Sequence, residues 1–468
     1  MASDRAISIA KLKQVGGDWE LRRMVFLLAL PAVGEQVLNT AVGLTDQFLV
    51  GHLDADVATA QGYDRAMALA SVGLANMLVW ITTTLFIAVA VGVTAVVARR
   101  IGERREEEAN LALRQALLLS VVVGVIGTLI GFFGGEWILR LLGASSEVAV
   151  IGAEYLRIVS LSFVPAAVMF AGTAALRGAG DTRSPLYLMA VVNVINILLS
   201  WLLVNGNLGL PGLGVNGSAI GTAVSRTLAG VILLALFAFG RMRLKVSHDW
   251  RPHWDTIRKI VKIGLPSAGE LFIFQAAILV MAFFITALGT VAYAAHTVAI
   301  NIESVSFLPG LGFAIAATAL VGQALGAEDP ELAERATWEA LLQGGLMMTI
   351  MGLIMAAWPA TIISWIAPDP AVIEQAVGPL RLAGLAQPLL AMAFIFIGAL
   401  RGAGDTIWPL GMRIIATWIV RVPLMVALLA LTEWGLFAIW LAMFGDFAVQ
   451  SILSLARFQG GKWKTIQI

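Results

Sequence analysis

Apolar stretches long enough to cross a lipid bilayer recur along the whole chain, and they constrain its fold more than any other feature. A bilayer core is about 30 Å thick and a helix rises about 1.5 Å per residue, so one crossing takes about 20 apolar residues. Of the 468 residues 59% are hydrophobic and 13% are charged, against about 25% charged in ordinary soluble proteins. A water-soluble domain is therefore excluded. We predict twelve spans, near 24–50, 67–97, 114–134, 148–174, 185–204, 215–240, 263–288, 294–322, 337–358, 376–400, 407–431 and 435–457.

The basic residues are distributed asymmetrically between the segments that connect these spans. The two terminal tails and the alternate loops carry 24 of the 31 Lys and Arg residues, whereas the opposite loops carry only Arg65 and Arg140. Because Lys and Arg are retained on the cytoplasmic side, both termini are predicted to be cytoplasmic in a multi-pass protein of the cell membrane. The first span contains Glu35 and Asp46 and no small-residue cleavage site follows it, so we do not interpret it as a signal peptide.

An internal repeat divides the chain into two similar halves. The heptapeptide Leu-Arg-Gly-Ala-Gly-Asp-Thr occupies 176–182 and again 400–406, and Leu-Pro-x-x-Gly-Glu occurs at 30–35 and 265–270. We predict an all-α membrane protein with two six-helix lobes, 1–245 and 246–468, joined through the charged stretch 241–262. Since each half has an even number of spans, the lobes should be related by a pseudo-twofold axis along the membrane normal. Two such lobes suit alternating access, so the architecture indicates a transporter.

Three motifs resemble one family. They are the duplicated Arg-Gly-Ala-Gly-Asp-Thr loop, Thr45-Asp46-Gln47-x-x-Val50-Gly51 in the first span, and Ala294-Ala295-His296 in the eighth. In order and spacing they resemble the multidrug and toxic compound extrusion (MATE) transporters over nearly the whole chain. This resemblance implies a V-shaped, two-lobe, twelve-helix fold, a monomer, and export of amphipathic organic cations in exchange for H+ or Na+.

The first span contains two acidic residues, which is unusual because a charged carboxylate inside a bilayer is costly and commonly marks an ion pathway. Glu35 and Asp46 are eleven residues apart, which places them about 20° apart on one helix face and about 16 Å apart along it, with Asn39 on the same stripe. We expect this stripe to face the lobe interior, where removal from water favours the neutral carboxyl and allows protonation. Alternatively, Asp46 is a solvated acid at the helix end. The resemblance implies that Asp46 is the ion-coupling residue.

The fifth span presents amide and hydroxyl groups on one face. Asn193, Asn196 and Ser200 are spaced by three and four residues, which is typical of a hydrogen-bonding wall, although packing between membrane helices uses the same residues. In members that resemble the DinF branch an aspartate occupies the position of Ser200, while Asn196 matches. That departure argues against a switch made of two aspartates. Asp46 could still titrate with Asn196 and Ser200 as partners, since an amide both donates and accepts.

The second half offers a rival ion site at Glu270, His296 and Glu303, the last two of which share a helix face. Sodium-coupled members that resemble the NorM branch use acids on helices 7 and 10, but the tenth span has none, and Glu270 lies about a turn earlier. We therefore favour H+ and keep Na+ as the alternative. His296 could instead bond a neighbouring carbonyl group. Glu35 and Glu270, which are equivalent in the repeat, could equally neutralise buried arginines.

Glycines and prolines mark candidate caps and hinges. Glycines should end the fourth and tenth helices, and Asp181 and Asp405 could cap the helices that follow. Pro31 and Pro266 each lie one turn before a repeat-equivalent glutamate, so they could be hinges or static kinks. The candidate cap and hinge residues are Pro31, Pro266, Gly178, Gly180, Asp181, Gly402, Gly404 and Asp405.

Three function classes remain to be compared. A secondary antiporter is favoured. A flippase for lipid-linked anionic amphiphiles of the same superfamily is the alternative, and it would use the intramembrane arginines Arg157, Arg226, Arg381 and Arg421 as headgroup ligands. An enzyme ranks last, since the chain has no cysteine and no His-Glu-x-x-His, Gly-x-Ser-x-Gly or phosphate-loop pattern. No cofactor or resident metal is expected, and a formal charge of +1 does not favour nucleic acid as a partner.

Overall fold

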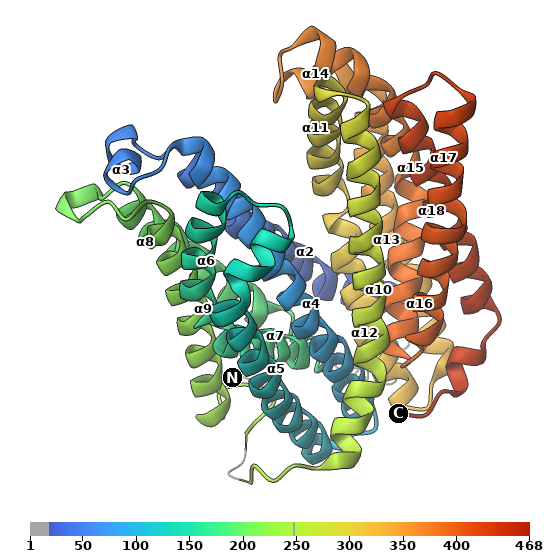
Figure 1. Cartoon of the computed structure of the whole chain (residues 1–468). Coiled ribbons are helices and arrows are strands. Elements are labelled where there is room, and N and C mark those ends of the chain that lie inside the picture. The colour runs from blue at the N-terminus through green and yellow to red at the C-terminus, as the bar shows by residue number, and fades with distance from the viewer. Residues whose placement is uncertain (1–17, 247–248) are drawn as a thin grey trace. The chain divides into compact units, whose positions relative to one another are not determined.

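The computed structural model describes residues 18–246 and 249–468, and all regular structure among them is helical (Figure 1). The predicted cytoplasmic tail before Asp18, and residues 247–248 of the predicted linker, lie outside the described residues. The first half contains α2 (Asp18–Gly51), α3 (Ala55–Ala60), α4 (Arg65–Gly102), α5 (Glu106–Leu141), α6 (Ser146–Ser160), α7 (Phe163–Gly178), α8 (Arg183–Val204), η1 (Asn207–Gly209) and α9 (Gly214–Ala238).

The second half repeats this helical pattern. It contains α10 (Trp254–Ala287), α11 (Thr290–Ser306), α12 (Leu308–Gly326), α13 (Pro330–Ala357), α14 (Pro359–Ser364), α15 (Pro370–Gly402), α16 (Ile407–Arg413), the π-helix η2 (Ile414–Arg421), α17 (Val422–Leu431), α18 (Leu436–Gln459) and η3 (Lys462–Thr465). Eleven described helices, counting α11 with α12 and α16 through α17 as continuous spans, are long and apolar enough to cross a membrane. The pair α6 and α7, bent by 54°, supplies the twelfth, so the twelve predicted spans are confirmed.

Contacts group the described residues into two compact units. The first unit contains Gly34–Val93 and Glu106–Val261, and the second contains Thr94–Arg105, Lys262–Ile468 and the described part of Ile7–Val33. The division therefore falls inside α2, shortly after Pro31, and inside α10, shortly before Pro266. In the first unit α5 packs on α6 and α7, and α8 packs on α9. In the second, α15 packs on α11, α12, α13 and α18.

The bend between α6 and α7 follows from local sequence. Pro165, in the first turn of α7, has no N–H group and cannot complete the hydrogen bond that would continue α6 into α7. At the break, Thr128 of α5 donates its hydroxyl to the carbonyl of Ser160 at 2.8 Å. The predicted span 148–174 is therefore two helical segments whose junction is satisfied by a neighbouring helix.

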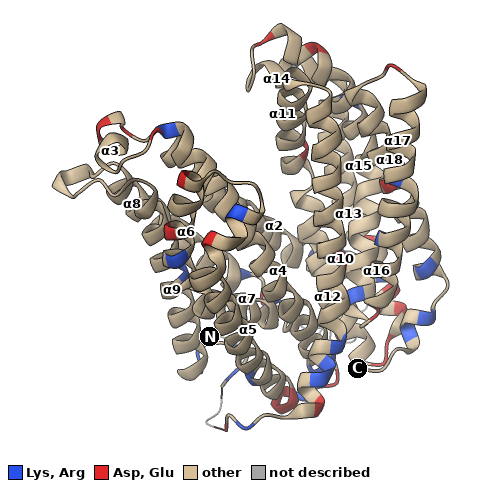
Figure 2. Cartoon of the chain, in the orientation of Figure 1, with Lys and Arg blue, Asp and Glu red and all other residues tan. Residues whose placement is uncertain are grey.

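Several helices extend beyond the predicted apolar spans, because a helix can continue where its side chains become polar. The predicted third span begins at 114, but α5 begins at Glu106 with three glutamates in its first turn, where the helix dipole favours negative charge. Figure 2 shows charged residues gathered toward helix ends and connecting segments, with long uncharged stretches between them.

Both copies of the repeated loop form the same helix end. Gly180 and Gly404 have φ values of 85° and 87°, the left-handed region that glycine tolerates. Asp181 N–H donates to Leu176 C=O at 2.9 Å, and Asp405 N–H donates to Leu400 C=O at 2.8 Å, which completes a Schellman motif in each copy. The prediction that these glycines end their helices is thus confirmed by geometry.

The aspartates of the two loops differ in their partners. Asp181 accepts from Ser184 N–H at 3.0 Å and from the Ser184 hydroxyl at 2.6 Å, so it stabilises the start of α8 as expected. The side chain of Asp405 instead accepts from Arg457 Nε of α18 at 2.8 Å. The cap expected at Asp405 is therefore replaced by an ion pair, because α18 brings a guanidinium to this copy of the loop.

Candidate functional site

The carboxyl group of Asp46 is the centre of a hydrogen-bonded cluster inside the first unit. Asp46 lies on α2 and is only 3% exposed. Its Oδ1 accepts from the Ser200 hydroxyl of α8 at 3.3 Å, and its Oδ2 accepts from the Thr222 hydroxyl of α9 at 2.6 Å. Within the part of the chain that the structure describes, no Lys or Arg nitrogen lies within 4.0 Å of this carboxyl. The acid is buried rather than solvated, and its hydrogen-bond partners are neutral.

The amides of α8 take different positions around this cluster. Asn196 Nδ2 donates to the Thr222 hydroxyl at 3.1 Å, and that hydroxyl donates to Asp46, so the three residues form a chain of hydrogen bonds that ends on the carboxyl group. Asn196 Oδ1 is buried without a hydrogen-bond partner. Asn193 Nδ2 donates to Met189 C=O of its own helix at 2.9 Å. Asn39, expected on the same buried stripe of α2, is exposed. The structure thus brings Asn196 and Ser200 to Asp46 and leaves Asn193 and Asn39 outside the cluster.

A glycine on α9 makes the cluster possible. A side-chain carbon added at Gly221 would overlap Ser200 Oγ, and one added at Gly217 would overlap the backbone of Leu203. The two glycines are four residues apart on one face, the spacing that lets membrane helices approach closely. This close approach of α9 to α8 places Thr222 and Ser200 on the same carboxyl group.

We expect Gly221→Ala to destabilise the protein by about 1–3 kcal/mol, because the added methyl group overpacks the contact between α8 and α9. Gly73→Ala on α4 is the matched control: nothing lies within 4 Å of the added carbon, so helix propensity alone should make it neutral or stabilising. Thermal unfolding of both purified variants measures the difference. Equal melting temperatures would show that the close packing at Gly221 is not needed.

Each unit contains one of the repeat-equivalent glutamates, Glu35 in the first and Glu270 in the second, and both are ion-paired. Glu35 is 4% exposed and its Oε1 lies 2.5 Å from Arg177 Nη1. Glu270 is 2% exposed and lies 2.7 Å from Arg401 and 3.4 Å from Arg413. Arg177 and Arg401 are the arginines of the two repeated heptapeptides, so each pair ties an early helix of its half to the repeated loop. This arrangement matches the alternative that the repeat-equivalent glutamates neutralise arginines.

Glu303 and His296, the remaining site residues predicted in the second half, lie close to residues that the sequence reasoning missed. His296 and Glu303 of α11 are 9% and 2% exposed, and neither His296 Nδ1 nor Glu303 Oε1 has a hydrogen-bond partner. Close by, Arg421 Nη1 lies 3.5 Å from Asp446 Oδ2. Asp446 was detectable in sequence as an acid inside the last predicted span. Thr222 carried no such signal, because hydroxyl residues are common in membrane helices.

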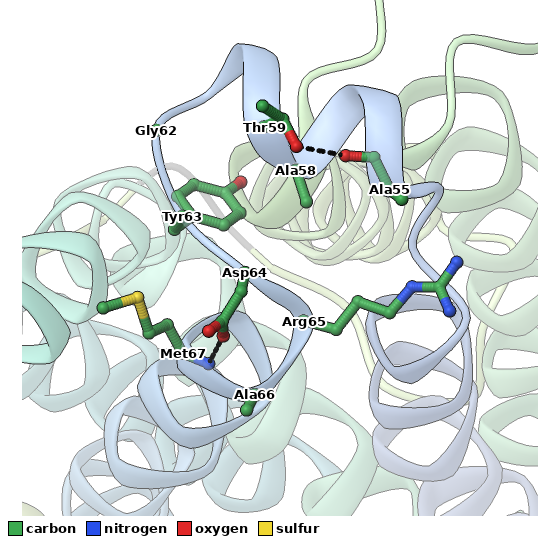
Figure 3. A pocket seen from close by; sticks show the side chains of 9 residues that line it. All are labelled: Ala55, Ala58, Thr59, Gly62, Tyr63, Asp64, Arg65, Ala66 and Met67. Carbon is green, nitrogen blue, oxygen red and sulfur yellow. Dashed lines mark hydrogen bonds between the residues drawn. The ribbon is translucent and has the colours of Figure 1, made fainter.

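A cavity of about 700 Å³ opens at the α3 end of the first unit, and no predicted site residue lines it. Its walls include Tyr63, Asp64 and Arg65 (Figure 3). The Tyr63 hydroxyl accepts from Val215 N–H at 2.9 Å, and burial raises the pKa of this hydroxyl, so it stays neutral. Asp64 Oδ1 accepts from Met67 N–H at 2.7 Å, which caps α4. These polar groups are used by the fold itself.

No group of three or more His, Asp or Glu side chains that could hold a metal ion occurs among residues 18–246 and 249–468. The polar groups of the Asp46 cluster are hydroxyls and an amide around one carboxyl. Such a set can bind and release a proton, and its hydroxyl donors stabilise the ionised form.

Comparison with known proteins places this arrangement in a family. The sequence model of the MatE family matches residues 31–202 and 266–427. A probable multidrug resistance protein NorM of Thermotoga maritima is 31% identical over 446 residues, covering 95% of this chain and 94% of its own length. A protein of the same description from Mesorhizobium japonicum is 32% identical, covering 93% of each chain.

Solved structures show the same fold. A crystal structure of a MATE protein in complex with MaD5 superimposes with a TM-score of 0.85 at 22% identity, over 96% of this chain and 98% of that chain. A MOP superfamily transporter from Pyrococcus furiosus, described as having a binding pocket of reversed polarity, gives a TM-score of 0.86 at 22% identity, over 95% of this chain and 97% of that chain. With the duplicated match and the multi-pass helical fold, these likenesses show that the chain belongs to the MatE family of multidrug efflux transporters.

Proposed function

We propose that this protein exports amphipathic organic cations in exchange for protons, and that Asp46 carries the exchanged proton. One observation carries the proposal: Asp46 is buried, and its hydrogen-bond partners are the neutral hydroxyls of Ser200 and Thr222. Glu35, Glu270 and Asp446 are also buried, but each lies within 4.0 Å of an arginine nitrogen. Arg226 lies within electrostatic reach of Asp46 but forms no ion pair with it, so a proton can cancel the charge of Asp46 without breaking an ion pair. Protonation of the paired acids would leave a buried guanidinium without its partner.

The cluster offers different hydrogen bonds to the two protonation states. The ionised carboxylate accepts from Ser200 and Thr222, as in the structure. The protonated acid must donate one hydrogen, and Asn196, which now donates its Nδ2 to Thr222, has a buried Oδ1 without a partner. Protonation would therefore rearrange the contacts that join α2 to α8 and α9. A proton shifts the equilibrium between two conformations only if it binds one of them more tightly than the other. The changed contacts around Asp46 would provide that difference in affinity.

The substrate class is supported by charge and by the relatives. A cation stabilises the ionised form of Asp46 and a proton neutralises it, so the two compete for one carboxyl, as exchange requires. The relatives at 31% and 32% identity are described as probable multidrug resistance proteins, which agrees with substrates of varied shape. We further propose that both termini face the cytoplasm and that the protein acts as a monomer.

The test uses purified protein in liposomes with a fluorescent organic cation such as ethidium. A proton gradient and a sodium gradient are imposed separately, with protein-free liposomes as the control. The proton gradient should drive ethidium across the membrane and the sodium gradient should not. Movement under sodium alone would refute proton coupling, and movement under neither gradient would refute cation exchange.

The flippase alternative is less well supported. Of the four arginines that it would use, Arg421 is 3% exposed and ion-paired with Asp446, so it is not free to hold a headgroup. Arg157 also has an acidic partner, because its Nη2 lies 3.8 Å from Glu136 Oε2.

A further inference from the structure

We propose that Glu303 is a second proton-binding site, in the second unit, and that it gives up its proton during transport while Arg421 shifts toward it from Asp446. This inference rests on the proposed proton exchange, and it adds a second proton to each cycle. It concerns the buried polar cluster of Glu303, His296, Arg421 and Asp446, which the Asp46 mechanism does not use.

The first step is the isolation of the Glu303 carboxyl group. Glu303 is 2% exposed, its Oε1 has no hydrogen-bond partner, and no Lys or Arg nitrogen in the described chain lies within 4.0 Å of it. An ionised carboxylate without a partner is very costly to bury, so the group is neutral in this arrangement. The cluster is then electrically balanced, because Arg421 and Asp446 cancel and His296 is a neutral ring.

The second step is the position of Arg421. It is 3% exposed and lies 3.5 Å from Asp446 Oδ2, close enough to Glu303 and His296 to act on both electrostatically. Its Nη2 contacts Met281 Sδ of α10 at 2.6 Å, and a thioether is a weak acceptor. Arg421 is therefore held by one long ion pair and one weak acceptor, and an ionised Glu303 would attract it.

The third step is the set of hydrogen-bond donors that Asp446 would keep if Arg421 moved away. The Gln450 amide donates to Asp446 Oδ1 at 2.8 Å, and the Thr417 hydroxyl lies 3.4 Å from the same oxygen. These neutral donors would remain on the Asp446 carboxylate if the guanidinium moved, and a new ion pair between Arg421 and the ionised Glu303 would offset the pair that is lost. Arg421 ends the π-helix η2, and Pro423, the second residue of α17, has no N–H group. A π-helical turn has looser backbone bonding than an α-helix and is frequent at functional sites, so this segment can absorb a shift.

One neighbouring charge reaches this cluster: Arg413 of α16 lies within electrostatic reach of Arg421, and it is ion-paired with Glu270. The sequences of α12 and α14 contain no charged residue, and the charges of α13 lie between Glu331 and Glu339 in its first turns. On α15, Glu374 and Arg381 are exposed and Arg401 is bonded to Glu270. Loss of the Glu303 proton would thus change the net charge of the cluster from 0 to −1, with Arg421 as the cation that responds.

Infrared difference spectroscopy tests the protonation without requiring transport. Full-length protein in lipid is titrated with acid and base, and the C=O stretch of protonated carboxyl groups is recorded. Glu303→Gln should remove one band that Asp46→Asn leaves in place, and Glu374→Gln, at an exposed glutamate, is the matched control. If the bands of Glu303→Gln equal those of the wild type, Glu303 does not exchange a proton and the inference is overturned.

Charge movement tests whether that proton is used. Two protons exchanged for one monovalent cation move one net charge, so an inside-negative potential of about 59 mV should raise the steady-state ethidium gradient about tenfold. Glu303→Gln should leave a one-for-one exchange that the potential does not affect. An equal response of the variant and the wild type overturns the inference and leaves the proposed function standing. If ethidium does not move at all, the proposed function fails and the infrared result alone decides on Glu303.

Discussion

Asp46→Asn is expected to reduce proton-driven export of an organic cation to the level of protein-free liposomes. Asparagine keeps the shape of the side chain but has no proton to gain or lose. Proton binding at this position then cannot favour one conformation of the transporter over the other, because a ligand that binds both conformations equally leaves their equilibrium unchanged. Ethidium efflux from proteoliposomes under an imposed proton gradient measures the loss. Undiminished transport by this variant would remove Asp46 from the mechanism.

Two controls separate this loss from a general defect. Asp56→Asn changes an exposed aspartate on α3 and should transport like the wild type. Ser200→Ala removes one of the two hydroxyl donors to Asp46, and the loss of a hydrogen bond worth about 1 kcal/mol should slow transport about fivefold without abolishing it. Thermal unfolding of the Asp46→Asn protein should remain close to that of the wild type.

Arg421→Met is expected to destabilise the protein by about 3–5 kcal/mol. Arg421 and Asp446 are 3% and 0% exposed, so removal of the guanidinium leaves the carboxylate buried with only neutral donors. Breaking a buried pair in this way costs more than the pair contributes to stability, because the remaining charge has lost its solvent. The measurement is thermal or denaturant unfolding of the purified protein in one detergent.

The double variant Arg421→Met with Asp446→Leu should recover most of that loss, since a buried ion pair can often be replaced by apolar side chains at little cost. An exposed pair provides the comparison. Arg140 and Glu136 lie 2.7 Å apart with side chains 54% and 35% exposed, so Arg140→Met should cost about 0–1 kcal/mol. A loss below 1 kcal/mol for Arg421→Met would show that the pair is solvated.

The sequence was sufficient for the features that depend on short stretches of chain. The twelve apolar spans required only hydropathy and length, because a membrane helix satisfies its own backbone hydrogen bonds within one segment. The repeated Gly-Ala-Gly-Asp loop predicted helix ends, and the structure has a Schellman motif at both. The sequence alone did not decide whether Asp46 is isolated from solvent, because an acid six residues before His52 fits both a buried position and an exposed helix end.

Partners far apart in sequence could not be predicted in the same way. Spacing along α2 placed Glu35 and Asp46 on one face, yet Arg177 reaches Glu35, whereas Ser200 and Thr222 reach Asp46. Asp181 and Asp405 occupy identical heptapeptides, yet Asp405 forms an ion pair with Arg457 of α18, whereas Asp181 accepts hydrogen bonds from Ser184.

The sequence by itself therefore determined how many helices cross the membrane, where the repeated loops end them and which acids lie within the apolar spans. Only the tertiary structure decided which of those acids form an ion pair with arginine and which do not. The reason is physical: hydropathy and helix ends depend on residues within a few turns of one another, whereas the cost of a buried charge depends on the nearest opposite charge, which packing brings from distant parts of the chain.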